Sequence, residues 1–182
     1  MDNGASSYRR FLNGEKDALI EIIKEYKDGL TFFLNGFCGN LSEAEELTQE
    51  TFVKLYVRKP RFNGKSSFKT WLYRIGRNTA VDYLRKKSRG GDTLCEDFTD
   101  SSANPEISYF REEDKQNLHK AMCRLKPEYR QILWLVYFES MSVGESAKIL
   151  KKSENNTSVL LHRAKKALKS ELTKEGFDHE NL

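Results

Sequence analysis

Residues 68–87 read FKTWLYRIGRNTAVDYLRKK, a stretch that combines two properties seldom found together. Large apolar residues and a threonine recur at steps of three and four, so a helix would bury them on one face: Phe68, Trp71, Leu72, Ile75 and Thr79. Six basic residues share this helix with one acid, Asp82, which we expect to pair with Arg85 or Lys86. Aromatic rings and cations on a rigid helix suit a polyanion whose bases can stack. An amphipathic core helix with a solvated basic face fits the same pattern, so the rest of the chain has to decide.

The basic residues are segregated along the chain. Residues 54–91 contain twelve lysines and arginines against Asp82 alone, whereas the whole chain of 182 residues has a net charge of only +4. A segregated basic block usually faces nucleic acid or an anionic surface. The length allows one large domain or two small ones, and 38% hydrophobic residues suffice to form a core.

The sequence indicates neither an enzyme nor a metalloprotein. Cys38, Cys95 and Cys123 are far apart and form no CxxC pair, so we expect reduced thiols and no zinc site. No phosphate-binding loop, nucleophile elbow or HExxH motif occurs, and we predict no catalytic residue, no metal and no cofactor. The chain starts without a signal-peptide segment and no run approaches a membrane span, which predicts a cytoplasmic protein with no membrane contact of its own.

Two helices are expected before the basic aromatic segment. A stripe of apolar residues predicts the first over residues 17–37, with glycines at its end. The second begins at a capping box in which Ser42 caps and Glu45 reaches back, and it runs to about residue 57. Residues 61–67, RFNGKSS, then form a loop with an Asn-Gly turn.

The helical periodicity stops at Ser88 and resumes near Ile107. The intervening segment is rich in glycine, serine and acidic residues and is predicted to be a linker. Its acids either solvate a flexible tether or pass through a positively charged channel in a partner. We therefore predict an all-α protein of two small helical domains joined by a flexible linker, divided as 1–90 first domain, 91–110 acidic linker, 111–175 second domain and 176–182 tail.

The second half is predicted to contain a helix-turn-helix. Pro127 at a first helical position opens a strongly apolar helix. Residues 142–145, SVGE, form a second capping box and begin a short helix. A tight turn at 151–153 leads into a helix over about 154–172 with a basic face. An ordinary helical hairpin is the alternative.

These segments resemble a known family. Five segments resemble sigma region 2 of extracytoplasmic-function (ECF) sigma factors: AEELTQETF at 44–52, FNG at 62–64, FKTWLYRI at 68–75, RN at 77–78 and DYLR at 82–85. Sigma region 4 resembles the stretch from LKPEYR at 125–130 to LHRA at 161–164. The resemblance covers about residues 8–172, in the right order and with a linker between the two regions.

The resemblance implies a docking helix for core RNA polymerase. In the family, the helix matching residues 45–54 binds the clamp helices of the β′ subunit. The residues that match this motif are Glu46, Leu47, Gln49, Glu50, Phe52 and Lys54. The apolar members of this set could instead belong to the core.

The resemblance also implies a surface that melts the −10 promoter element. In the family, a flipped base occupies a pocket to which the residue matching Asn78 contributes, and a pocket is needed because flipping costs a few kcal/mol. An exposed polar residue is the alternative for Asn78. Aromatics including Phe68 could stack on unpaired bases. The expected −10 contacts are Arg61, Phe62, Asn63, Lys65, Lys69, Trp71, Tyr73, Arg74, Arg77, Asn78 and Arg85.

The helix beginning at Glu154 matches the family's reader of the −35 duplex, with departures. Family members commonly have a glycine and an apolar residue in the turn, where this chain has Lys151 and Lys152, and often basic residues in place of Ser158 and Leu160. Expected −35 contacts are Asn155, Asn156, Ser158, Val159, His162, Arg163 and Lys166, with Lys165 as a further phosphate contact. Val159 and Leu160 could instead pack against a partner.

The resemblance predicts a promoter-recognition subunit and not an enzyme. Its expected partners are the β and β′ subunits of core RNA polymerase, promoter DNA and an anti-sigma factor that could be membrane-anchored. The alternative is a sigma-like decoy that sequesters an anti-sigma factor without directing transcription. Such a decoy would have little use for the basic aromatic helix.

Overall fold

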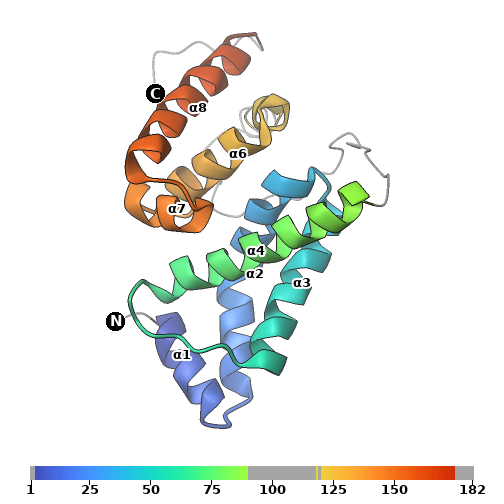
Figure 1. Cartoon of the computed structure of the whole chain (residues 1–182), viewed down its shortest axis with the longest axis vertical. Helices are drawn as coiled ribbons and strands as arrows, with labels where there is room; N and C mark the ends of the chain where they lie inside the picture. The colour runs from blue at the N-terminus through green and yellow to red at the C-terminus, as the bar shows by residue number, and fades with distance from the viewer. Residues whose placement is uncertain (1–2, 90–117, 119, 175–182) are drawn as a thin grey trace.

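The chain folds into helices that form two packed halves (Figure 1). The computed structural model describes residues 3–89, 118 and 120–174, and no strand occurs among them. The first half comprises α1 (Asn3–Leu12), α2 (Asp17–Cys38), α3 (Leu41–Arg58) and α4 (Phe68–Arg89). The second comprises α6 (Pro127–Leu133), the π-helix η2 (Trp134–Phe138), α7 (Val143–Leu150) and α8 (Glu154–Lys174). The all-α class is confirmed, whereas the predicted linker at 91–110, Cys95 and the tail at 176–182 lie outside the described residues.

The ends of the helices follow from their local chemistry, with one correction. Gly39 ends α2 in the left-handed conformation, with φ of 69°. The predicted capping box at Ser42 is wrong, because Asn40 is the N-cap of α3 and its side chain accepts a hydrogen bond from the Glu43 N–H at 3.0 Å. The amide of Asn40 lies where it can satisfy the first turn, so the helix begins before Ser42. The capping box at 142–145 is confirmed.

An aromatic cluster organises the first half. Phe68 is fully buried, and its ring centroid lies 5.5 Å from Tyr8 and 5.7 Å from Tyr26. Tyr8 comes from α1, a helix that the sequence reasoning did not predict, and its hydroxyl donates to the Pro60 carbonyl at 2.8 Å. Burial raises the pKa of Tyr8 to about 12. The cluster thus joins α1, α2 and α4 and ties down the chain that leads into the 61–67 loop.

The second half is a helix-turn-helix supported by α6 and η2. The predicted apolar helix from Pro127 is divided into α6 and η2, because its last turn widens into a π-helix. In η2 the rings of Trp134 and Phe138 stack with their centroids 4.4 Å apart. On α8, the buried stripe includes Leu160, which is 7% exposed. Leu160 therefore packs in the core of this chain and is not free for a partner.

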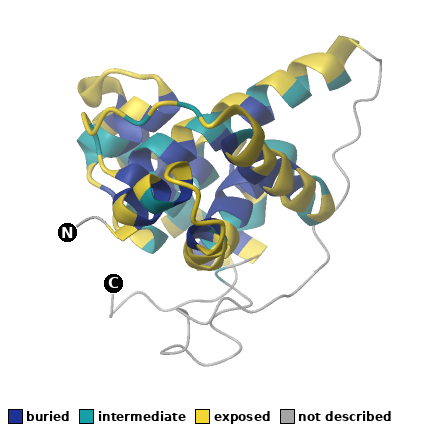
Figure 2. Ribbon diagram, turned by 90° about the horizontal axis from the view of Figure 1, so that it is seen from below, coloured by how far each residue is buried: buried dark blue, intermediate teal, exposed yellow. Residues whose placement is uncertain are grey.

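The two halves pack directly against each other, which the sequence reasoning did not predict. Gln131 Nε2 donates to the Gly36 carbonyl at 3.2 Å, and Trp134 Nε1 donates to the Gly29 carbonyl at 3.1 Å. The two glycines are seven residues apart on α2, about two helical turns, so they lie on one face. Their missing side chains let α6 and η2 approach the backbone of α2. Buried residues of both halves belong to one hydrophobic cluster, and Figure 2 shows that the exposed faces of the helices surround the buried ones.

Candidate nucleic-acid interface

The loop at 61–67 is fixed to α4 by an aromatic side chain. The half-buried ring of Phe62 lies 5.7 Å from Phe68 and 5.2 Å from Trp71. The Asn63 side chain accepts a hydrogen bond from the Lys65 N–H at 3.1 Å, and Gly64 has φ of 71°, so the predicted turn is present. The loop holds three exposed polar side chains beside the start of α4: Arg61, Asn63 and Lys65.

The outward face of α4 continues this surface. Arg74, Asn78 and Arg85 are exposed at steps of four and seven, so they share one helical face. Trp71, three residues before Arg74, is half-buried at the start of the same stripe. Arg85 forms only a long ion pair with Asp82, at 3.8 Å, as the sequence predicted. The last turns of α4 project beyond the packed helices (Figure 1), so this face is open to solvent.

The surface carries cations without carboxylate partners. Within the described part of the chain, no ion pair is formed by Arg61, Lys65, Arg74 or Arg77. Burial and, after it, repulsion by Arg85 lower the pKa of Arg77. Unpaired cations beside half-buried aromatic rings can neutralise phosphates and offer faces on which unpaired bases stack.

Two of the expected base-stacking aromatics do not reach this surface. Phe68 and Tyr73 are both 0% exposed, because their positions on α4 face α2 and the core. Lys69 is nine residues before Asn78, which is half a turn out of phase, and it points to the opposite side of the helix. There its ammonium pairs with Glu139 of the second half at 2.6 Å.

The face of α3 that carries the expected polymerase-docking residues is partly different from the one predicted. Leu47 and Phe52 are 3% and 6% exposed and belong to the core. Lys54 lies between the helices, where it donates to Thr79 Oγ1 at 2.9 Å and pairs with Glu50 at 2.8 Å. Glu46, Gln49 and Glu50 are exposed as expected.

An apolar extension of this face was missed from the sequence. Val53, Tyr56 and Val57 are 56%, 51% and 68% exposed. They follow Gln49 and Glu50 at helical spacing, so polar and apolar side chains form one outward stripe on α3. The signal was available, because these three residues are apolar yet fall outside the buried stripe of the helix.

The surface of α8 is simpler. All seven expected −35 residues are exposed: Asn155, Asn156, Ser158, Val159, His162, Arg163 and Lys166. The helix is anchored from below by the fully buried Thr157 and Ala164. Ser153 caps it, since the Ser153 hydroxyl accepts from the Asn156 N–H at 3.2 Å. Lys165 differs from its neighbours, because its ammonium lies 5.3 Å from the centroid of the Tyr137 ring.

The turn of the helix-turn-helix explains one departure from the family pattern. Lys151 has φ of 55° in the left-handed region, where glycine is the favoured residue. Its N–H still bonds to the Ala147 carbonyl, so the helix ends normally. The lysine therefore adopts the same backbone as a glycine at some conformational cost.

Comparison with known proteins agrees with this geometry. The family model "Sigma-70 region 2" matches residues 22–90, and "Sigma-70, region 4" matches residues 115–168. The ECF RNA polymerase sigma factor SigM of Bacillus subtilis (strain 168) is 30% identical over 154 residues, which cover 82% of this chain and 92% of SigM. The chain belongs to the ECF sigma factors of the sigma-70 family. Both halves thus come from a family of regulators of transcription rather than of enzymes.

Other relatives extend the likeness along the whole sigma factor. SigW of the same bacterium is 29% identical over 170 residues, covering 87% of this chain and 91% of SigW. Among solved structures, the sigma factor RpoE in complex with the anti-sigma factor NepR from Bartonella quintana has a TM-score of 0.68 at 23% identity. The match covers 84% of this chain and 97% of RpoE, so the two proteins share a fold.

Two further observations bear on the site. In the described residues, no group of three or more histidine, cysteine or acidic side chains is arranged to hold a metal ion. None of the described helices combines the length and the apolar character that crossing a bilayer requires.

Proposed function

We propose that this sigma factor binds core RNA polymerase, reads the −35 element as a duplex with α8 and melts the −10 element with α4 and the loop before it. The observation that carries the proposal is the pair of separate surfaces with unpaired cations, one of which adjoins half-buried aromatic rings and the other lies on a helix-turn-helix. A stacking surface suits unpaired strands, and a helix-turn-helix suits a major groove. One chain with both needs a DNA site that is partly melted and partly paired.

On the −10 surface, Asn78 is the proposed contact to a flipped base. Its exposed amide lies one turn beyond Arg74, whose guanidinium is free to hold a phosphate. Trp71 and Phe62 would stack on neighbouring unpaired bases. The proposed −10 contacts are the expected ones with two exceptions. Tyr73 is excluded because it is buried, and Lys69 is excluded while the two halves are packed because it pairs with Glu139.

On the −35 surface, the amides and hydroxyl at the start of α8 are the proposed base-edge readers. Asn155, Asn156 and Ser158 occupy the first turns, the part of a recognition helix that enters the major groove. Arg163 and Lys166 lie further along and would bind phosphates. Val159 is exposed and can contact a thymine methyl group.

Core polymerase is proposed to dock on the outward stripe of α3. This stripe consists of Glu46, Gln49 and Glu50 followed by Val53, Tyr56 and Val57, and it replaces the set that included buried Leu47 and Phe52. An exposed apolar patch beside acidic residues is typical of a protein–protein interface. Since core polymerase and the promoter are cytoplasmic, we place the protein there.

An anti-sigma factor is the proposed inhibitory partner. The solved relative from Bartonella quintana is bound to one, and this chain shares its fold. An inhibitor that covers α3 or the DNA-contacting faces would block each step above. Whether it is membrane-anchored is part of the same hypothesis and can be read from the partner that the purified chain binds.

The test is transcription by core polymerase reconstituted with the purified chain on a promoter library. Asn78→Ala should reduce open-complex formation by about five- to 150-fold, because a base contact is worth about 1–3 kcal/mol. Its binding to core polymerase should be unchanged. Tyr56→Ala is the matched variant with the opposite pattern, since it should weaken core binding and leave single-stranded −10 DNA binding intact.

Two outcomes would overturn the proposal. Equal loss of core binding and open-complex formation in Asn78→Ala would remove the pocket role. No transcription from any promoter, together with tight binding of an anti-sigma protein, would favour the decoy. The basic aromatic surface speaks against the decoy, because a mimic needs no cations for DNA.

A further inference from the structure

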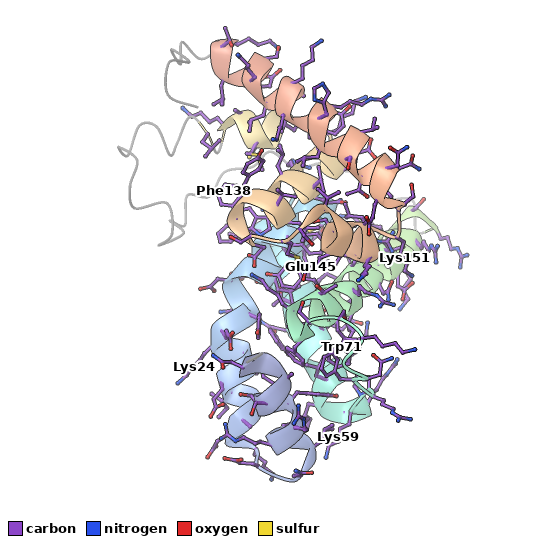
Figure 3. All side chains as sticks on the ribbon, turned by 90° about the vertical axis from the view of Figure 1, so that its left-hand side faces the viewer. Lys24, Lys59, Trp71, Phe138, Glu145 and Lys151 are labelled. Atoms are coloured by element: carbon purple, nitrogen blue, oxygen red, sulfur yellow. The ribbon has the colours of Figure 1, made fainter. Side chains whose placement is uncertain are left out.

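The two halves are joined by a polar contact at the first turn of α4. One of its members, Glu145, is labelled in Figure 3, where it lies between the second half and the first. Glu145 of α7 accepts hydrogen bonds from the Ser67 and Thr70 hydroxyls, both at 3.2 Å. The Lys69 ammonium pairs with Glu139 at 2.6 Å and donates to the Glu139 carbonyl at 3.0 Å. Two carboxylates of the second half therefore hold three polar side chains at positions 67, 69 and 70 of the first.

The ion pair is partly buried, with the Lys69 side chain 33% exposed. The Glu139 side chain is 9% exposed, and its other oxygen accepts from Trp134 Nε1 at 3.2 Å. The Gly29 backbone lies against it, because a Cβ at this position would collide with the Glu139 carboxylate. Substituting one partner alone would leave the other charge in this contact without its counter-ion, which disfavours the closed arrangement.

In the closed arrangement, α4 and α8 lie too close together to bind both promoter elements at once. α8 packs on α7 and α7 packs on α4, and packed helix axes are about 8–10 Å apart, so α8 lies within about 20 Å of α4 at this point. By their names the −35 and −10 elements are centred about 25 base pairs apart, which at about 3.4 Å per pair is about 85 Å of duplex. The 28 residues of 90–117 can span at most about 95 Å when extended, so the covalent chain permits the wider separation.

We propose that the contact of Glu139 and Glu145 with Ser67, Lys69 and Thr70 is an intramolecular latch, which keeps the chain closed and has to open before both promoter elements are bound. The role of the latch in promoter binding rests on the proposed function. The closed state itself rests only on the contacts between the two halves.

The latch couples opening to DNA binding through Lys69. In the closed chain its charge is neutralised by Glu139, so it cannot also hold a phosphate. In the open chain its charge is no longer neutralised, and it lies in the first turn of α4 beside the 61–67 loop, on the side of the helix opposite Asn78. A polyanion that binds only the open chain shifts the equilibrium toward it, and by linkage a weaker latch strengthens binding.

The test measures the distance between the halves in buffer alone. Spin labels are placed at Ile20→Cys on α2 and Ser170→Cys on α8, in a chain whose native cysteines are alanine, and the distance distribution is read by pulsed electron paramagnetic resonance. Wild type should give one narrow distance distribution, because the two halves are held in a single arrangement. The latch variant Glu139→Gln/Glu145→Gln should raise the ratio of open to closed molecules by about tenfold, since charge-assisted hydrogen bonds are lost.

The charge-matched control is Glu128→Gln/Glu171→Gln. These acids pair with Lys152 and Lys174 inside the second half, so the control has the same net charge but keeps the latch. It should stay closed. Identical distributions for the latch variant and the control would overturn the proposal, as would a wild-type chain that is mostly open.

A charge exchange keeps the test decisive if the glutamine variant folds poorly. Lys69→Glu should open the chain, and Lys69→Glu/Glu139→Lys should close it again. A failure of the second change to restore the narrow wild-type distribution would overturn the pairing. Transcription is scored separately. Only Glu139→Gln/Glu145→Gln is used for this, because it changes no proposed DNA contact. If it opens but supports no transcription, the proposed function is refuted and the latch stands; if it is active with an unchanged distance distribution, the latch is refuted and the proposed function stands.

Discussion

The helices that carry the two candidate DNA-contacting surfaces, α4 and α8, are held in the molecule in different ways. α4 packs against α1, α2, α3 and α7 and buries seven residues along its length. α8 packs on α6 and α7 and buries four. The seven expected contacts on α8 are all exposed, whereas the expected contacts on α4 and its loop are mixed with core and interface residues.

The difference predicts how substitutions behave in each helix. On α8, reading residues and anchoring residues are separate, so changes in DNA binding and in folding stability can be separated. On α4 the two roles share neighbouring positions, so many substitutions should change both. The predictions below test this contrast.

The largest effect is expected for Phe68→Ala in α4. The ring is fully buried among four other aromatic rings, and its loss should lower the free energy of unfolding by about 3–5 kcal/mol. Because Phe62 rests on Phe68, the loop should move as well, and single-stranded DNA binding should fall. Urea unfolding followed by circular dichroism measures the first effect and fluorescence anisotropy the second. A stable variant that still binds DNA would break the contrast.

The next effect is expected for Leu160→Ala in α8, set against its neighbour Val159→Ala. Leu160 is 7% exposed and Val159 is 42% exposed. Leu160→Ala should cost about 2–3 kcal/mol of stability, whereas Val159→Ala should change stability by no more than about 0.5 kcal/mol. Only the Val159 variant should alter the preference for −35 sequences. If both variants lost stability equally, α8 would not separate its two roles.

The same contrast shows what sequence reasoning could and could not find. Periodicity sufficed for α2, α3, α4, α7 and α8, although it missed α1 and the division between α6 and η2. It also sufficed for the exposed residues of α8, because that helix has one buried stripe and one solvent face. It failed for Tyr73 and Lys69, whose surroundings come from α2 and η2, far away in the sequence. The contact between the halves depends on Gly29 and Gly36, whose carbonyls accept from Trp134 and Gln131. No local sequence pattern predicts these hydrogen bonds, because the two partners of each lie far apart in the sequence.

The third prediction concerns the turn that sets α8 in place. Lys151 occupies the left-handed region with φ of 55°, so Lys151→Gly should raise the free energy of unfolding by up to about 1 kcal/mol. Lys152 does not have a positive φ, and Lys152→Gly is the matched control, which should be neutral or slightly destabilising. Thermal unfolding of both variants measures the difference. A loss of stability in Lys151→Gly would mean that the lysine side chain stabilises the turn in a way that outweighs its backbone strain.

The smallest effect is expected where α7 contacts the start of α4 through Glu145. Burial alone would raise the pKa of this carboxyl, but hydrogen bonds from Ser142, Ser67 and Thr70 outweigh it and hold the pKa below its ordinary value. A carboxyl with a lowered pKa in the folded chain adds stability that is complete above its unfolded pKa, about 4.3, and is lost as the pH falls through the folded value.

Glu145→Gln keeps the capping geometry but cannot titrate, so it isolates this contribution. The difference in free energy of unfolding between wild type and variant should stay constant from about pH 7 to about pH 5 and shrink below about pH 4. Urea midpoints across this range give the difference directly. Its size should be modest because the carboxyl is partly solvated, and solvent weakens each of its interactions. A difference that grew on acidification would have the wrong sign for a carboxylate acceptor and would mean that α4 and α7 are held together by a protonated group.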